Sequence, residues 1–347
     1  MNYTFHKAVL ITLLSLSSSI VQSEQTTHSK DVYTEPKLIN RTSPNYPPHE
    51  LEDANAGAVE VIFMVDKTGK TFEPILGYTS KPQFGIYALN AIKNYRYKPA
   101  TLNGKPIDSL KRLRVDFAVQ DQDDQVSQQF RKHYRTASKE LSKENPNKNK
   151  IKKRINSMAN SSHMSPYSYR HLNSIKHHYA SLFKDEQAQI DSIHELLLFE
   201  SKTKEASAAL GDELRIKMRR RLVELLIKTG QYGEAIAEYK NLKRIDSKAK
   251  TLYKEAFKKI NDIRESDQLI KRSITLNEQG HKLTHLFKSS FGLFNAEGVD
   301  QLKLRCTHKF KTLEYQPDSE YKIPQSWGFC YLQIIGKPSS TVELYQI

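Results

Sequence analysis

The residues best suited to chemistry in this chain are two cysteines, twelve histidines and a few close carboxylate pairs. A catalytic Ser or Cys needs a nearby His and an orienting carboxylate, and many hydrolases hold the serine in a Gly-x-Ser-x-Gly turn. The sequence has no such turn, and it has neither a phosphate-binding loop nor a dinucleotide-binding fingerprint. These patterns favour a binding or scaffolding protein over an enzyme.

The histidines are spaced poorly for metal binding. His177 and His178 are adjacent, so their rings diverge on a helix, whereas ligands four residues apart share a face. His281 and His285 have that spacing, but they lie at a turn boundary and have no third ligand nearby. The pair Asp123 and Asp124 lies in a polar stretch without a pocket signature. We therefore expect no metal and no cofactor.

Cys306 and Cys330 are the only cysteines, and both lie near the end of the chain. In an exported protein an isolated pair favours a disulfide over a metal site, which needs further ligands. The bridge would close a loop of about 25 residues and stabilise a small domain by roughly 3 kcal/mol. Trp327, three residues before Cys330, either packs on the bridge or binds a partner at the surface.

The N-terminus indicates the compartment. Lys7 precedes an uncharged run, Ala8 to Val21, that is too short to cross a bilayer as a helix, and Ser23 ends a cleavage-like site. We predict a signal peptide over 1–23, export to the periplasm and a mature start near Glu24. An uncleaved segment would instead leave the chain anchored in the inner membrane.

The elements that follow begin with a polar tether, 24–43, which we expect to be flexible. From 44 to 120 the pattern predicts a β-β-α-β domain. The first strand starts at Gly57 and places alternate residues on one face, a glycine turn leads to a second strand over 71–79, and a helix follows. Pro99 cannot continue the helix, so Arg96 to Lys98 leave it as an extended segment. The final strand runs from Leu110 to Val119, and we expect its polar face to stay in water.

This segment resembles the C-terminal domain of the TonB energy-transducer family. The matching residues are Pro44, Tyr46, Pro47, Gly57, Val59, Val61, Phe63, Val65, Asp66, Gly69, Phe84, Ala88, Ala91, Tyr95, Arg96, Tyr97, Pro99, Ala100, Asn103 and Gly104, together with the last alternating strand. The resemblance implies that an extended peptide from an outer-membrane transporter pairs with the last strand. The implied partner-binding residues are Ser43, Pro44, Tyr46, Leu110, Arg112, Arg114 and Asp116.

Two features depart from that family. Ser43 stands where the transducers commonly have Gln, in the portion that meets the transporter peptide. The polar tether is also too short to span the periplasm as the Pro-rich spacer of a transducer does. Arg112 and Arg114 either attract an acidic partner or form a solvated strand face that discourages aggregation at the edge.

The next segment, 121–165, is polar and basic. Twelve Lys or Arg residues lie between Arg131 and Ala180, against only Glu140 and Glu144. We expect a solvated linker with some helix, and contact with anionic lipid is one use of such charge. No nucleic-acid-binding motif accompanies it, so we expect no nucleic-acid partner.

The remaining chain divides at about residue 267. Residues 166–267 have helical periodicity, and 214–245 resemble one tetratricopeptide-type hairpin, with an ordinary helical bundle as the alternative. Residues 268–347 predict short strands at Arg272–Leu276, Leu283–Phe287, Leu302–Cys306, Lys309–Tyr315, Gly328–Ile335 and Thr341–Tyr345, in a sandwich-like module.

The sequence thus predicts an α+β multidomain chain with a non-enzymatic role. The favoured function is a periplasmic TonB-family protein that binds an extended peptide or an outer-membrane TonB-dependent transporter, or another envelope protein. The alternative is a periplasmic structural adaptor that docks proteins through its helical region, without energy transduction.

Overall fold

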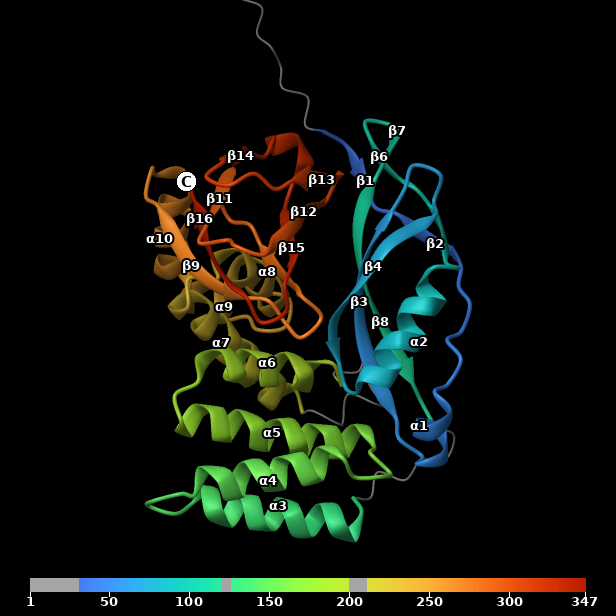
Figure 1. Cartoon of the computed structure of the whole chain (residues 1–347), viewed down its shortest axis with the longest axis vertical. Coiled ribbons are helices and arrows are strands. Elements are labelled where there is room, and N and C mark those ends of the chain that lie inside the picture. The colour runs from blue at the N-terminus through green and yellow to red at the C-terminus, as the bar shows by residue number, and fades with distance from the viewer. Residues whose placement is uncertain (1–30, 120–125, 200–210) are drawn as a thin grey trace, which may run out of the picture. The chain divides into compact units, whose positions relative to one another are not determined.

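The computed structural model of the 347-residue chain describes residues 31–119, 126–199 and 211–347. The predicted signal peptide and its cleavage site lie outside the described residues. Within them a mixed α/β region comes first, then helices, then an all-β region, which confirms the α+β multidomain prediction (Figure 1).

The N-terminal domain is a three-stranded antiparallel sheet with one helix. Its strand order is β4 (Thr71–Thr79), β3 (Gly57–Val65), β8 (Ser109–Phe117), and α2 (Pro82–Ile92) lies against one face (Figure 1). The predicted apolar stripes meet there because strand residues two apart and helix residues three or four apart share a face. The buried core they form is Val59, Val61, Phe63, Val65, Phe84, Ala88, Ala91, Ile92, Tyr95, Tyr97, Val115 and Phe117.

The described part of the predicted tether is not a free coil. It contains β1 (Tyr33–Thr34), which pairs with β6 (Ala100–Leu102), and β2 (Lys37–Asn40), which pairs with β5 (Arg96–Lys98). β6 also pairs with β7 (Lys105–Ile107) across the predicted turn. Polar sequence does not prevent this, because main-chain hydrogen bonds make little demand on side chains.

The second face of the sheet is covered along β3, whereas Arg112 and Asp116 of β8 are exposed and Arg114 is half-buried, in line with the expectation that the polar face of the last strand stays in water. Ala58, Ile62 and Met64 on this face are all buried. The helices and the C-terminal strands pack over it, and Ala58 shares a core with Phe130 of the first long helix. Nothing in the sequence indicated the cover over β3, because the covering elements come from distant parts of the chain.

The segment predicted as a basic linker contains two packed helices, α3 (Gln128–Leu141) and α4 (Lys148–Ala159). Ser127 and Asn147 cap their N-termini by accepting hydrogen bonds from Phe130 N and Lys150 N. Each helix buries an apolar stripe in a core shared with α5 (Pro166–Leu182). The high charge obscured these stripes, which have only three or four members each.

The helices continue as antiparallel neighbours. α6 (Glu186–Leu197) packs on α5, and α7 (Asp212–Lys228) and α8 (Tyr232–Leu242) form the hairpin expected over 214–245, with Gly230 at φ 68° in its turn. The tetratricopeptide assignment of this hairpin stays a prediction. α1 (Pro48–Glu52), α9 (Ala249–Leu252) and α10 (Lys254–Glu265) complete the described helices.

The C-terminal region is a β-sandwich, as predicted. One sheet has the order β10 (His281–His285), β15 (Cys330–Gly336), β12 (Val299–Cys306), β13 (Phe310–Glu314). The other has the order β14 (Tyr321–Lys322), β11 (Ser290–Phe294), β16 (Thr341–Gln346), β9 (Ile270–Thr275). Apolar residues of both sheets share one core. β11 and β14 were not predicted.

The predicted disulfide is present. Cys306 and Cys330 face each other across β12 and β15, and both are buried in the sandwich core. Trp327, in the 3-10 turn Gln325–Trp327 before β15, packs against the same core, which matches the first of its two interpretations.

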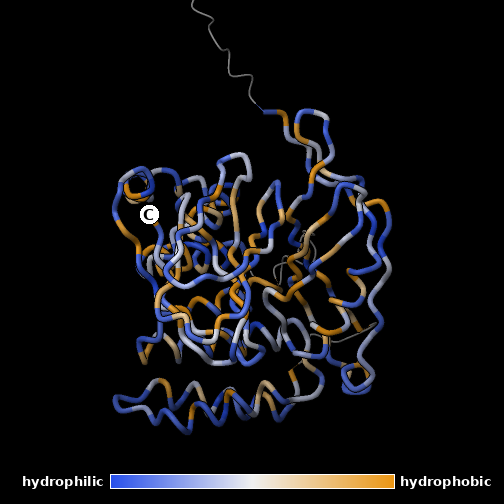
Figure 2. Tube along the Cα trace, turned by 45° about the horizontal axis from the view of Figure 1, so that its top comes forward, coloured by the Kyte–Doolittle hydropathy of each residue, from blue (hydrophilic) through white to orange (hydrophobic). Residues whose placement is uncertain are grey.

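The three regions belong to one unit, Val32–Ile347. The N-terminal sheet contacts the sandwich at Glu73 of β4, which pairs with Lys303 and Arg305 of β12. Figure 2 shows hydrophobic residues concentrated within the sheets and along the buried sides of the helices. Among the described helices, none is long and apolar enough to span a membrane.

Candidate functional site

β8 places four of the predicted site residues at one edge of the N-terminal sheet. It pairs with β3 from Ser109 to Phe117 and is the last strand on that side. Leu110 N donates to Thr307 O of the sandwich at 3.4 Å, so the main chain of Leu110 points away from β3. Because main-chain groups alternate along a strand, those of Arg112, Arg114 and Asp116 point outward as well.

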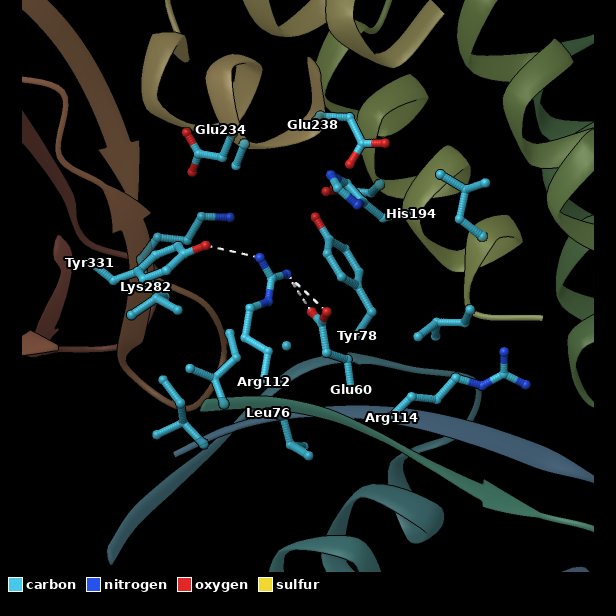
Figure 3. A pocket seen from close by; sticks show the side chains of 18 of the residues that line it. Glu60, Leu76, Tyr78, Arg112, Arg114, His194, Glu234, Glu238, Lys282 and Tyr331 are labelled. Carbon is cyan, nitrogen blue, oxygen red and sulfur yellow. Dashed lines mark hydrogen bonds and ion pairs between the residues drawn. The ribbon is translucent and has the colours of Figure 1, made fainter. Parts of the chain in front are cut away.

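The Arg112 side chain is fixed by partners within the chain. It donates two hydrogen bonds to the Glu60 carboxylate, at 2.9 and 2.8 Å, and one to the Tyr331 hydroxyl at 2.9 Å (Figure 3). Burial opposes its charge, but Glu60 and Tyr331 more than compensate and hold the pKa of Arg112 above its ordinary value. Its side chain still exposes 40% of its surface, because it lines an open cavity.

Arg114 is also paired, since its Nε donates to Asp116 at 2.6 Å along the same strand face. Both arginines therefore have carboxylate partners within the chain. Whether the two arginines favour an acidic partner or form a solvated strand face stays a prediction.

The other three predicted site residues, Ser43, Pro44 and Tyr46, lie in the segment before α1 and not on β8. Tyr46 packs edge-on against Phe84 and Phe117, at centroid distances of 5.8 and 5.7 Å, and its hydroxyl donates to Asn55 O. Burial, with a smaller effect of Glu50, raises the pKa of Tyr46 to about 12. Tyr46 thus fixes the chain that leads into α1, while Pro44 is half-buried and Ser43 is exposed.

A cavity of about 480 Å³ lies over the second face of the sheet. Figure 3 shows side chains from the sheet, the helices and the sandwich converging on it. The charged groups include Glu60, Arg112 and Arg114 from the sheet, Asp191, Arg219, Glu234 and Glu238 from α6, α7 and α8, and Lys282 from β10. Glu234 accepts a hydrogen bond from His285 N through one carboxylate oxygen, and its other oxygen is buried without a hydrogen-bond partner.

Tyr78 and His194 form a stacked pair in this cavity, with ring centroids 4.5 Å apart. Burial, assisted by Arg112 and Arg219, lowers the pKa of His194 to about 3. Burial also raises the pKa of Tyr78 well above its usual value. Both rings are therefore neutral at ordinary pH, and the pair joins α6 to β4 as a packing contact.

His194 should make the fold sensitive to acid. Above pH 6.5 it is neutral in both states, but below that pH only the unfolded chain readily takes up the proton, so the free energy of unfolding falls as pH drops towards 3. We expect a loss of about 1–2 kcal/mol by pH 5 from this group. Chemical denaturation at pH 7 and pH 5 should show a smaller loss in His194→Gln.

The comparison with the variant isolates His194 from its neighbours. Asp191, whose pKa is raised by burial, acts in the opposite direction, since it takes up a proton more readily in the folded state. Glu238 is paired with Arg219 nearby. Equal pH dependence in the wild type and His194→Gln would contradict the assignment.

Sequence reasoning missed the cavity residues. Glu60 carried a signal, because it lies on the mixed face of the first predicted strand. Tyr78, His194, Glu234 and Tyr331 carried none, since they come from four separate segments and meet only after folding. Within the described ranges no three His, Cys, Asp or Glu side chains are grouped as a metal site.

The comparisons with known proteins concern the N-terminal domain. Residues 42–119 match the family model described as the Gram-negative bacterial TonB protein C-terminal. This part of the chain is a TonB-family C-terminal domain. The TonB-like domain, as we call residues 42–119 below, ends just after β8, so the helices and the sandwich lie beyond the match.

One solved structure among the matches is the solution NMR structure of the TonB C-terminal domain of Pseudomonas aeruginosa. The two sequences are 17% identical in this match, which covers 26% of this chain and 92% of the solved chain, with a TM-score of 0.23. No curated protein matches the chain.

Proposed function

We propose that this chain is an envelope protein whose TonB-like domain binds an extended peptide segment of an outer-membrane partner, without catalysis. The peptide adds as a strand to the outer edge of β8. The observation that carries this proposal is the edge itself: the main-chain groups of Arg112, Arg114 and Asp116 point outward, and no described strand pairs with them.

The main chain is the source of affinity in this proposal. A sheet edge offers N–H and C=O groups that a peptide satisfies with little dependence on its sequence. Arg112 and Arg114 already pair with Glu60 and Asp116, so they contribute less to charge selection than the sequence suggested. The sandwich occupies the start of the edge at Leu110, so only a short length of the edge is free for the peptide.

Arg114→Pro should weaken peptide binding at least tenfold, because proline removes the outward N–H of residue 114 and leaves no donor there. The N–H groups that face β3 belong to the neighbouring residues, so the β3 ladder keeps its hydrogen bonds. The measurement is fluorescence anisotropy of labelled peptides from the plug segments of TonB-dependent transporters, titrated with the full chain.

Arg114→Gln is the matched control, since it changes the side chain and keeps the N–H. We expect its affinity to stay within about threefold of the wild type, the size of a weak surface ion pair. A peptide N-methylated at alternate residues tests the same contact without changing the protein. Tight binding by both Arg114→Pro and the N-methylated peptide would refute strand addition at β8.

A structural adaptor is the second candidate, and one observation favours it. The sandwich contacts the TonB-like domain through hydrogen bonds at Glu73, Leu110 and Arg112. A domain held this firmly serves as part of a larger docking body. If no plug peptide binds the wild-type chain, while an envelope protein is captured by the helical region alone, the adaptor replaces the peptide-binding proposal.

A further inference from the structure

We propose that the α3–α4 hairpin, residues 128–159, is an electrostatic docking surface for anionic lipid head groups. The hairpin carries ten Lys or Arg residues and two Glu residues. It lies at the end of the helical region, beyond α5 (Figure 1). The proposal is independent of peptide binding at β8.

The first step concerns which side of each helix is free. α3 buries Phe130, Ala137 and Leu141, and α4 buries Ile151, Ile155 and Met158, in one core with α5. Helix residues four apart share a face, and Arg131, Arg135 and Lys139 follow this spacing on α3. All three are exposed, on the side opposite the buried stripe.

The second step concerns the acids that oppose this charge. Glu140 is buried and forms ion pairs with Lys150 at 2.9 Å and Lys143 at 3.0 Å. These two lysines lower the pKa of Glu140 to about 2. Glu144, in the turn between the helices, is the other carboxylate of the hairpin. After these are matched, the exposed surface keeps a clear excess of cations.

The third step is a shallow groove of about 590 Å³ along the hairpin. Its wall contains Lys152, Lys153, Asn149 and Asn156 of α4 and His133 of α3, and none of its lining residues is a carboxylate. Ammonium and amide groups donate to phosphate oxygens. The neighbouring Arg154 lies 3.3 Å from His133 Nδ1, and burial and this cation lower the pKa of that ring.

The shape and composition favour a lipid surface over nucleic acid. Single-stranded nucleic acid is usually held by exposed aromatic rings that stack on bases. Here Phe130 is buried, and Tyr134 packs against Phe130 and His171. The apolar stripes are also occupied by the core, so the hairpin adsorbs through charge and does not insert.

The test is co-sedimentation of the full chain with two kinds of vesicle, phosphatidylglycerol mixed with phosphatidylcholine, and phosphatidylcholine alone. We expect binding to the anionic vesicles only, and loss of that binding at high salt, because exposed charges are screened. The triple variant Arg135→Gln/Lys139→Gln/Lys153→Gln should lower the partition coefficient roughly 100-fold.

The matched control is Lys105→Gln/Lys311→Gln/Lys322→Gln, which removes three exposed lysines elsewhere. It should bind as the wild type does, and thermal melting should show that both variants fold. Equal losses in the two variants, or equal binding to neutral vesicles, would overturn the proposal. Binding of the wild type to duplex DNA without binding to anionic vesicles would replace lipid with nucleic acid as the partner.

Discussion

Glu73→Ala should lower the free energy of unfolding by about 1–3 kcal/mol, less than the loss on breaking a fully buried ion pair, because the Glu73 side chain is 32% exposed. Glu73 lies on β4 of the TonB-like domain, and Arg305, whose side chain is 0% exposed, lies on β12 of the sandwich. The Arg305 guanidinium donates to the Glu73 carboxylate at 2.9 Å and to its carbonyl at 2.5 Å. Gln333 accepts two further hydrogen bonds from it, at 3.0 and 2.7 Å.

Glu73→Ala destabilises the fold because the charged Arg305 guanidinium stays in place without its carboxylate partner. Burial lowers the pKa of Arg305, and Glu73 is the charge that offsets this cost. Without the carboxylate, a guanidinium stays in the interface with only neutral acceptors, and Lys303 Nζ loses its 2.8 Å partner as well. Glu73→Gln keeps an acceptor and removes the charge, so it should cost less than Glu73→Ala.

A double-mutant cycle separates this pair from general packing. Arg305→Met removes the buried charge, so Glu73→Ala in that background should cost less than about 1 kcal/mol. Glu278→Ala, at an exposed carboxylate in a turn, is the matched control and should be nearly neutral. Additive losses in the double variant, measured by denaturant unfolding, would show that Glu73 and Arg305 are not coupled.

The sequence predicted the local elements where the periodic spacing of apolar residues or a turn identified them. The alternation from Val59 to Val65, the glycine turn and the helical stripe from Phe84 to Tyr95 all lie in contiguous segments. The basic hairpin was expected as a solvated linker with some helix, and its packing was missed because its buried stripes are narrow and lie among lysines. β11, Ser290–Phe294, was missed because its buried residues run continuously and lack the alternation of a half-buried strand.

The candidate site was less predictable because its contacts join distant segments. Alternation located the last strand and the family resemblance implied its binding role, yet nothing near Arg112 indicated Glu60 or Tyr331 as its partners. Arg112 and Tyr331 are 219 positions apart. Glu73 carried no signal either, since one glutamate in a strand normally faces water, and only the contact with β12 makes it the partner of the buried Arg305.

These contacts define how the chain would use its TonB-like domain. The sandwich fixes one end of β8 through Leu110 and Thr307, and the cavity fixes Arg112. Hence a peptide that adds to this edge begins at Arg112 and meets a strand whose side chains are already positioned. Preorganisation of this kind lowers the ordering cost of binding, so under the peptide-binding proposal the sandwich would assist binding by holding β8 in place.

Removal of the disulfide, in Cys306→Ala/Cys330→Ala, should destabilise the sandwich by about 3 kcal/mol. The bridge joins residues 24 positions apart, and β13, β14 and the turn with Trp327 lie inside that loop. Without it the unfolded loop gains conformational freedom. The midpoint of thermal unfolding of the sandwich should fall as well, because its unfolded state is the one that gains freedom.

Trp327 makes this loss measurable for the sandwich alone. It is the only tryptophan of the chain and packs on the core that contains both cysteines, so its fluorescence follows this region through a melt. The wild type with a reductant should melt like the double variant, and the reductant should leave the double variant unchanged. An unshifted fluorescence midpoint in the reduced wild type, with the thiols shown to be free by alkylation, would mean that strand pairing and the apolar core suffice without the bridge.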